Sequence, residues 1–166
     1  MLHLHSRIRV QRLFVSFVFM AIFSGALPSL ALAARDYASI DMQQLDDTGD
    51  IMLTHVRISI STEDAVINAA ELVLAYDSDA LKIDHFDAAN SDFQMAVPNQ
   101  QERGVINIVR GTTKGLSFGS YQFVDIYFAR TNPRRAYINL LPASQVTARD
   151  GQGTNVFDGR LGKLLL

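Results

Sequence analysis

The feature that most constrains the fold is an alternation of apolar and polar residues with a period of two, which recurs along most of the chain. Clear examples are VRISI at 56–60, ELVLAY at 71–76 and VDIYF at 124–128. Because successive side chains of a β-strand point to opposite faces, such runs predict strands with one inward face. After residue 33, no window of eleven or more residues has the apolar spacing of an amphipathic helix. The pattern therefore predicts an all-β protein.

Turn-forming residues separate the alternating runs, and their spacing predicts how the strands are arranged. The turn signals are DDTGD at 46–50, PNQQERG at 98–104, GTTKG at 111–115, TNPRR at 131–135 and RDGQGTN at 149–155. Strands are predicted at roughly 37–43, 51–61, 67–76, 81–87, 92–97, 104–110, 121–130, 136–141 and 145–148, with a further one at 160–166. Short strands at such regular spacing predict an antiparallel β-sandwich of about nine strands.

The first 33 residues differ from the rest and have the features of a secretory signal peptide. Three arginines precede the apolar run Leu13–Ala26, and Pro28 ends that run before a small-x-small motif at 31–33. We therefore expect cleavage after Ala33 and a mature domain of residues 34–166. That domain would be secreted or extracytoplasmic, in the periplasm or at the cell surface, with no membrane span. The alternative is an uncleaved N-terminal anchor, since residues 13–34 are just long enough to span a bilayer.

Composition excludes several classes of function. The chain has no cysteine, which removes disulfides, thiol nucleophiles and Cys-ligated metal centres. Three of the 15 basic residues lie in the leader and all 17 acidic residues follow it, so residues 34–166 carry a formal charge of −5. Nucleic-acid binding relies on a basic surface that contacts phosphates, so we expect no nucleic-acid partner.

Four stretches suggest a known family. INAAELVLAYDSDALKI at 67–83 describes a strand that runs into Tyr76 and Asp77 and returns at Leu81, with Asp77 placed to cap one helical turn. The other stretches are VRISIST at 56–62, FVDIYFAR at 123–130 and YINLLPASQVTARDGQGTNV at 137–156. In this order and spacing, residues 38–166 resemble the cohesin domain. Ser78 departs from the family pattern, in which proline is common at that position.

The resemblance implies a nine-stranded jelly-roll sandwich, related in fold to some carbohydrate-binding modules. Cohesins are non-catalytic and bind dockerin modules, and in this way they assemble polysaccharide-degrading enzymes. We therefore expect a secreted binding or assembly module with a dockerin-like protein partner, in a cell-surface or polysaccharide-degrading assembly. Two alternatives stay open: a carbohydrate-binding module, with a polysaccharide as the partner, and a structural subunit of a surface layer or filament.

The acidic residues near the Tyr-Asp corner do not predict a catalytic or metal site. The cluster comprises Asp77, Asp79, Asp84, His85 and Asp87. Regular alternation places Leu81, Ile83 and His85 on one side of the strand and Lys82, Asp84 and Phe86 on the other, so the carboxylates diverge. We interpret them as solvated turn and edge residues.

Two loops, 46–50 and 150–155, have the oxygen-bearing side chains and glycines that suit calcium, but neither has the register of an EF-hand loop. No cofactor is predicted, and calcium stays open. Outside the leader only His55 and His85 remain, and no hydrolase motif accompanies them. His55 is expected to be exposed on the polar row of its strand. With no catalytic residue identified, we expect a protein that is not an enzyme.

An outward row of aromatic residues is the best candidate for a binding surface. If Val124, Ile126 and Phe128 face the core, alternation places Phe123 and Tyr127 outside, and the same logic places Tyr137 outside on its own strand. Large exposed aromatic rings anchor protein partners or stack on sugars, and the absence of tryptophan favours the protein. Phe123, Tyr127 and Tyr137 are therefore predicted to contact the partner. The alternative is that they pack under a loop or a neighbouring strand.

Overall fold

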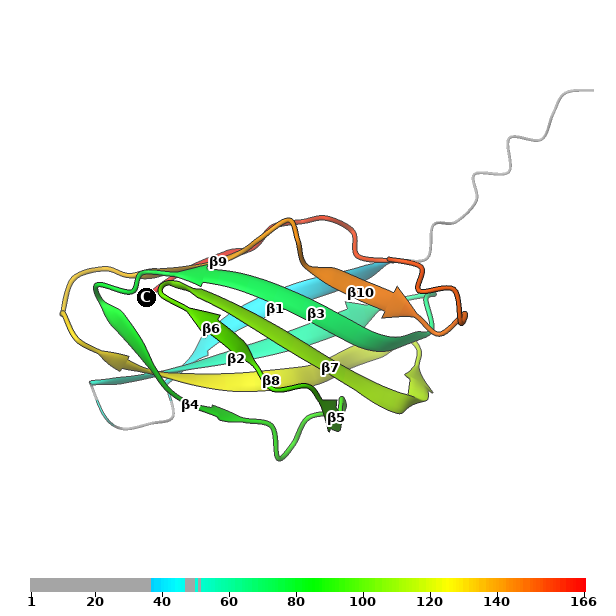
Figure 1. Ribbon diagram of the computed structural model, residues 1–166, viewed down its shortest axis with the longest axis horizontal. Coiled ribbons are helices and arrows are strands. Elements are labelled where there is room, and N and C mark those ends of the chain that lie inside the picture. The colour runs from blue at the N-terminus through cyan, green and yellow to red at the C-terminus, as the bar shows by residue number, and fades with distance from the viewer. Residues whose placement is uncertain (1–36, 47–49, 51) are drawn as a thin grey trace, which may run out of the picture. The chain divides into compact units, whose positions relative to one another are not determined.

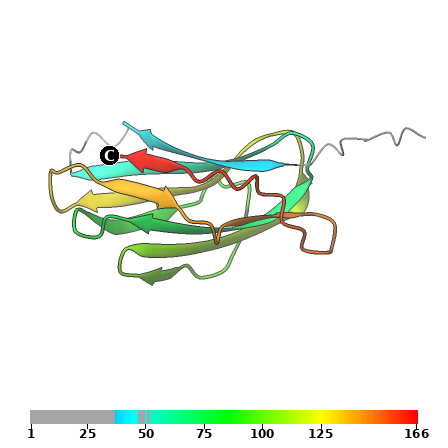
Figure 2. The ribbon, with the colours of Figure 1, turned by 90° about the horizontal axis from the view of Figure 1, so that it is seen from above.

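The computed structural model describes residues 37–46, 50 and 52–166, and within them two antiparallel β-sheets face each other (Figures 1 and 2). The predicted signal peptide at residues 1–33 lies outside the described residues. Within the described part of the chain, no helix is long and apolar enough to cross a membrane. The prediction of an all-β antiparallel sandwich is confirmed.

One sheet has four strands, in the order β1-β2-β8-β4. These strands are β1 (Ala38–Leu45), β2 (Leu53–Thr62), β8 (Gly119–Arg130) and β4 (Leu81–Asp87). Each neighbouring pair is antiparallel, and the pairing of β2 with β8 extends from Leu53–Ala129 to Thr62–Gly119. The two longest partners, β2 and β8, thus form the centre of this sheet.

The other sheet has seven strands and is built around β3 and β7. Its strands are β11 (Lys163–Leu165), β9 (Tyr137–Leu140), β3 (Ile67–Tyr76), β7 (Val105–Leu116), β5 (Met95–Ala96), β10 (Gln145–Ala148) and β6 (Gln100–Glu102). Both β9 and β10 pair with β3, so they act as one interrupted strand. At the interruption, the Ser144 hydroxyl accepts the Val73 N–H at 3.0 Å and thereby replaces a ladder hydrogen bond.

One predicted turn lies within a strand instead, since the GTTKG stretch at 111–115 belongs to β7. The stretch 98–104 contains the short strand β6 and then the turn at 103–104 that leads into β7. Gly115 has no room for a side chain, because an added Cβ would lie 2.6 Å from Val66 Cγ1. This glycine therefore permits a close approach of the neighbouring segment within a strand.

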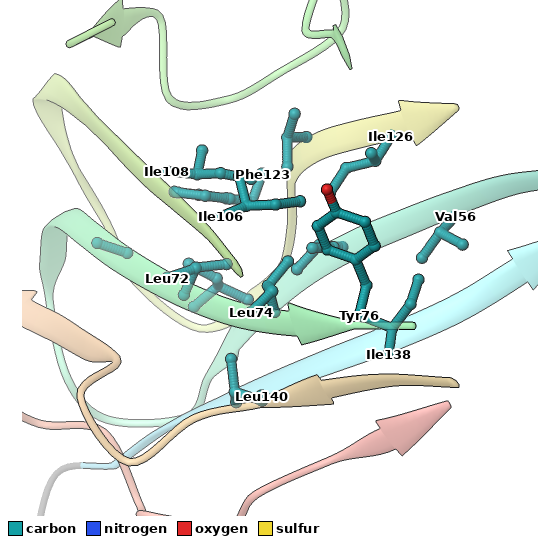
Figure 3. Close-up of a cluster of buried hydrophobic side chains, with 14 of the residues drawn as sticks. Val56, Leu72, Leu74, Tyr76, Ile106, Ile108, Phe123, Ile126, Ile138 and Leu140 are labelled. Carbon is teal, nitrogen blue, oxygen red and sulfur yellow. The ribbon is translucent and has the colours of Figure 1, made fainter. Parts of the chain in front are cut away.

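The core lies between the two sheets and is made of the inward rows of both (Figure 3). Leu72 and Leu74 of β3 and Ile106 and Ile108 of β7 are fully buried opposite the inward residues of β2 and β8. Their strict alternation with half-buried neighbours matches the period of two in the sequence. Burial of such large aliphatic side chains is the main favourable term in folding.

The Tyr-Asp corner forms as predicted between β3 and β4. The Asp77 carbonyl accepts the Leu81 N–H at 2.8 Å, and the Asp77 carboxylate accepts the Asp79 N–H at 3.2 Å. Leu81 returns to the core, and the buried Tyr76 ring packs on Phe128 with 5.6 Å between centroids. The Arg134 guanidinium also donates to the Asp77 carboxylate, at 2.9 Å. These hydrogen bonds make the corner a structural joint.

Candidate functional site

Phe123 does not lie on the surface, so the prediction that it faces outward is wrong. In the pairing of β2 with β8, Ile58 is opposite Val124 and Ser59 is opposite Gln122, which leaves Phe123 as the extra residue of a β-bulge. The bulge interrupts the alternation of sides. Phe123 is consequently fully buried, as the neighbouring Val124 also is.

The loop before β5 holds this bulge in place. The Ser91 hydroxyl donates to the Phe123 carbonyl at 2.7 Å, and the Asp92 carboxylate accepts the Gln122 N–H at 2.9 Å. Phe93, also in this loop, is fully buried and meets the Phe123 ring edge-on, with 5.2 Å between centroids. The packing under a loop that we left as the alternative for the aromatic residues therefore describes Phe123.

Tyr127 does face outward, on the four-stranded sheet, and its ring lies between two histidines. The centroid distances are 4.3 Å to His55 and 4.2 Å to His85, and both pairs are stacked. His55 is only 1% exposed, so the expectation of an exposed His55 is wrong. A second bulge, at Asp84, turns His85 onto the Tyr127 face and Phe86 toward the core, which reverses the sides predicted for them.

Asp125 is the polar centre of the same face and was not identified from the sequence. The Arg57 guanidinium donates to both of its oxygens, at 3.0 and 2.9 Å, and the Gln122 amide donates at 3.0 Å. His55 Nε2 lies 3.3 Å from Asp125 Oδ2. Buried carboxylates need such partners, so the cluster stabilises the outer side of the four-stranded sheet. A lone Asp within an apolar strand was the available signal.

Tyr137 lies on the seven-stranded sheet instead, where it is 38% exposed. Lys163 Nζ lies 5.4 Å from the centroid of its ring, a cation–π contact across the β9–β11 pair. The structure thus separates the three predicted contact residues: Phe123 is in the core, and Tyr127 and Tyr137 are on different sheets. The role of Tyr127 and Tyr137 in partner binding stays a prediction.

The outer side of the seven-stranded sheet carries small and apolar side chains along its two central strands. We define the β3–β7 face by the half-buried outward residues Ala69, Glu71, Val73, Ala75, Val105, Asn107 and Val109. At the β5 side of this face, Met95 and Val97 are 56% and 54% exposed. Apolar side chains therefore continue from the middle of the sheet to its edge.

A single polar pair lies within the β3–β7 face. The Asn107 amide nitrogen donates to the Glu71 carboxylate at 2.8 Å. The amide oxygens of Asn107 and of Asn139, which is paired with Ala75, are covered and have no hydrogen-bond partner among the described residues. Unpaired covered acceptors are uncommon and mark places where a further donor would be favourable.

The acidic residues of the corner and of the loop 150–155 are occupied by local contacts. Arg103 and Arg134 pair with Asp79 and Asp77 at 3.1 and 2.9 Å. The Thr154 hydroxyl and the Gln152 N–H donate to the Asp150 carboxylate and lower its pKa. In the part of the chain that the structure describes, no three Asp, Glu or His side chains come together as a metal site requires.

The arrangement of two antiparallel sheets with a Tyr-Asp corner defines a β-sandwich of the kind found in cohesins, and the structural comparisons confirm this fold. A search of family models gives no match, and neither does a search of curated protein sequences. Among solved structures, the cohesin module of a family 33 glycoside hydrolase from Clostridium perfringens matches with a TM-score of 0.59 and 15% identity. The match covers 79% of this chain and 96% of that module.

Two further cohesins match in the same way. The sixth cohesin of scaffoldin B from Acetivibrio cellulolyticus, solved in complex with a Cel5 dockerin, has a TM-score of 0.57 at 15% identity over 74% of this chain and 91% of its own. A non-cellulosomal cohesin from the archaeon Archaeoglobus fulgidus has a TM-score of 0.51 at 16% identity, over 80% of this chain and 91% of its own. At these identities the matches show the cohesin fold.

Proposed function

We propose that this chain is a non-catalytic, exported module that binds a protein partner through the β3–β7 face. The observation that carries the proposal is the composition of that face. Apart from the hydrogen-bonded pair Glu71 and Asn107, the outward residues of the two central strands are small or apolar, although they lie on the side of the sheet away from the core. Contiguous exposed apolar surface on a folded domain is typical of an interaction site.

The chemistry of the face suits a protein more than a sugar. The centre of a protein interface is depleted in charge and rich in close-packed apolar contacts, as Val73, Val105 and Val109 would provide. Small residues such as Ala69 and Ala75 allow a partner's side chains to approach the sheet closely. The unpaired amide oxygens would receive donors from the partner, which adds specificity to apolar contact.

The partner that we favour is a dockerin-like module. Cohesins from Acetivibrio cellulolyticus and Clostridium thermocellum that share this fold were solved in complexes with dockerins. Tyr137 borders the β3–β7 face and would contact such a partner at its rim, whereas Tyr127 lies on the other sheet. An assembly at the cell surface or one that degrades polysaccharide would be the setting.

A matched pair of variants tests the proposed face. Val73→Glu places a charge in the centre of the β3–β7 face, and Ser59→Glu places the same charge at a half-buried outward position of β2 on the other sheet. Wild type and both variants would serve as bait for proteins secreted by the source organism, with identification by mass spectrometry. We expect a dockerin-bearing protein to be retained by wild type and Ser59→Glu and lost by Val73→Glu. Equal retention by the two variants would contradict the proposed face.

Export has its own test. If the signal peptide directs secretion, the protein recovered from the outside of the cell begins at Ala34, which N-terminal sequencing detects directly. A protein that keeps Met1 and sediments with membranes would instead support the uncleaved anchor.

A further inference from the structure

A polar pocket of about 390 Å³ lies at one end of the four-stranded sheet, away from the β3–β7 face. It is lined by Tyr37, Ser39, Ser61, Glu63, Asp64, Asp158 and Arg160. Ser39 and Ser61 are paired across β1 and β2, and their neighbours Ile40 and Ile60 are paired on the core side. The two serine hydroxyls therefore lie on the outer side of the sheet, at the base of the pocket.

The walls of the pocket come from segments that are far apart in the sequence. On one side, the turn after β2 carries Glu63 and Asp64 and is closed by the Thr62 hydroxyl, which donates to the Ala65 carbonyl at 2.6 Å. On the other side, the Asp158 N–H donates to the Ala38 carbonyl at 2.9 Å, which fixes the loop 156–160 beside β1. These two hydrogen bonds hold both walls in place without a ligand.

The side chains of the pocket combine acceptors, donors and one aromatic ring. The three carboxylates accept hydrogen bonds, the Arg160 guanidinium donates them, and the serine hydroxyls do both. Arg160 Nε lies 3.4 Å from Asp158 Oδ2, so a donor and an acceptor are presented next to each other. Tyr37 is 49% exposed, and its ring supplies an apolar surface beside them.

This combination selects one class of ligand. An anion would be repelled by the three carboxylates. An ammonium group has donors only, so it would use the carboxylates and leave the donors of the Arg160 guanidinium with no acceptor besides Asp158. A metal ion would need three converging ligands, which no group of Asp, Glu and His provides among the described residues. A saccharide hydroxyl both donates and accepts, adjacent hydroxyls match an adjacent donor and acceptor, and the C–H face of a pyranose packs on an aromatic ring.

From this geometry we infer that the pocket binds a neutral saccharide unit, with Tyr37 as the ring against which it packs and Ser39, Ser61, Asp158 and Arg160 as its hydrogen-bonding groups. The site is independent of the β3–β7 face, so the same domain would hold a protein partner on one sheet and a glycan at the end of the other. Its volume lies in the range of small-ligand sites.

NMR titration of the isotope-labelled full chain tests the inference. The probes are the methyl glycosides of glucose, galactose, mannose and xylose, added one at a time up to about 50 mM, the millimolar range of weak single-site binding. We expect at least one of them to shift the amide signals of Tyr37, Ser39 and Ser61 in a saturable way. Methylammonium chloride at the same concentration is the cationic probe.

Matched variants make the test specific. Tyr37→Ala removes the proposed stacking ring, and Tyr137→Ala removes a similarly exposed tyrosine from the other sheet. We expect affinity for the glycoside to fall about tenfold in Tyr37→Ala and to stay unchanged in Tyr137→Ala. A double variant, Ser39→Ala with Ser61→Ala, should also weaken binding, while the fold is checked by an unchanged amide spectrum elsewhere.

Three results would overturn the inference. The first is that none of the four glycosides shifts the signals of the pocket. The second is that methylammonium shifts them and the glycosides do not, which would assign the pocket to a cation. The third is equal affinity in Tyr37→Ala and Tyr137→Ala, which would place any saccharide binding elsewhere.

Discussion

Replacement of Phe123 by alanine gives the sharpest test of the bulge in β8. The side chain is fully buried and meets Phe93 edge-on at 5.2 Å. Truncation of a buried phenylalanine costs about 3–5 kcal/mol. Folding then removes less apolar surface from water, and a cavity remains in the folded state. For a domain of this size, such a loss lowers the melting temperature by about 10–20 °C.

Urea unfolding followed by circular dichroism measures the free energy directly, with Tyr137→Ala as the control. Tyr137 is 38% exposed and its ring contacts Lys163, so its truncation should cost about 1 kcal/mol or less. A double-mutant cycle with Phe93→Ala should give a coupling of about 0.5–1.5 kcal/mol between the two rings. A loss below about 1 kcal/mol for Phe123→Ala would refute the buried bulge and restore the outward placement.

Three further predictions concern the polar contacts. Asp125→Ala should lower the free energy of unfolding by about 2–3 kcal/mol in urea titrations, because it removes the acceptor of the Arg57 guanidinium. The cost is limited to this range because Arg57 is partly exposed to solvent. A change under about 0.5 kcal/mol would argue against the cluster. Ser144→Ala should cost about 1 kcal/mol by the same assay, because the Val73 N–H loses its acceptor, and no change would mean that water replaces the hydroxyl. Because the pKa of Asp150 is lowered, its carboxylate stabilises the folded state above the ordinary pKa of an aspartate, and this stabilisation is lost as pH falls through the folded-state pKa. Asp150→Asn should therefore flatten the acid limb of the stability–pH curve. Parallel curves for wild type and variant would contradict this.

Most of the fold could be predicted because its signals are local. The alternation in β2, β3 and β8 and the turn residues between strands report on neighbouring positions of the chain, and the Tyr-Asp corner is formed by adjacent residues. The cohesin-like sandwich follows from the order of these elements. The two glycines of GTTKG predicted a turn, but their role is to leave space for neighbouring segments, which the sequence does not display.

The side-chain positions that were wrong depend on pairing between distant segments. A bulge adds one residue to a strand and breaks the alternation of sides at that point. The bulge at Phe123 turns this side chain inward beside Val124, and the bulge at Asp84 reverses the predicted side of His85. The buried position of His55 depends on Tyr127, more than seventy residues away in the sequence. The pocket likewise combines residues of β1 with the loop 156–160, which no local pattern connects.

Methyl NMR of the complex tests the central claim most directly. Val73, Val105 and Val109 carry methyl groups on the β3–β7 face, and Leu45 and Leu53 carry them on the outer side of the four-stranded sheet. When the captured partner is added, the account predicts that the three valine signals shift and the two leucine signals stay in place. Shifts at Leu45 and Leu53 with unmoved valines would place the partner on the opposite sheet and contradict the account.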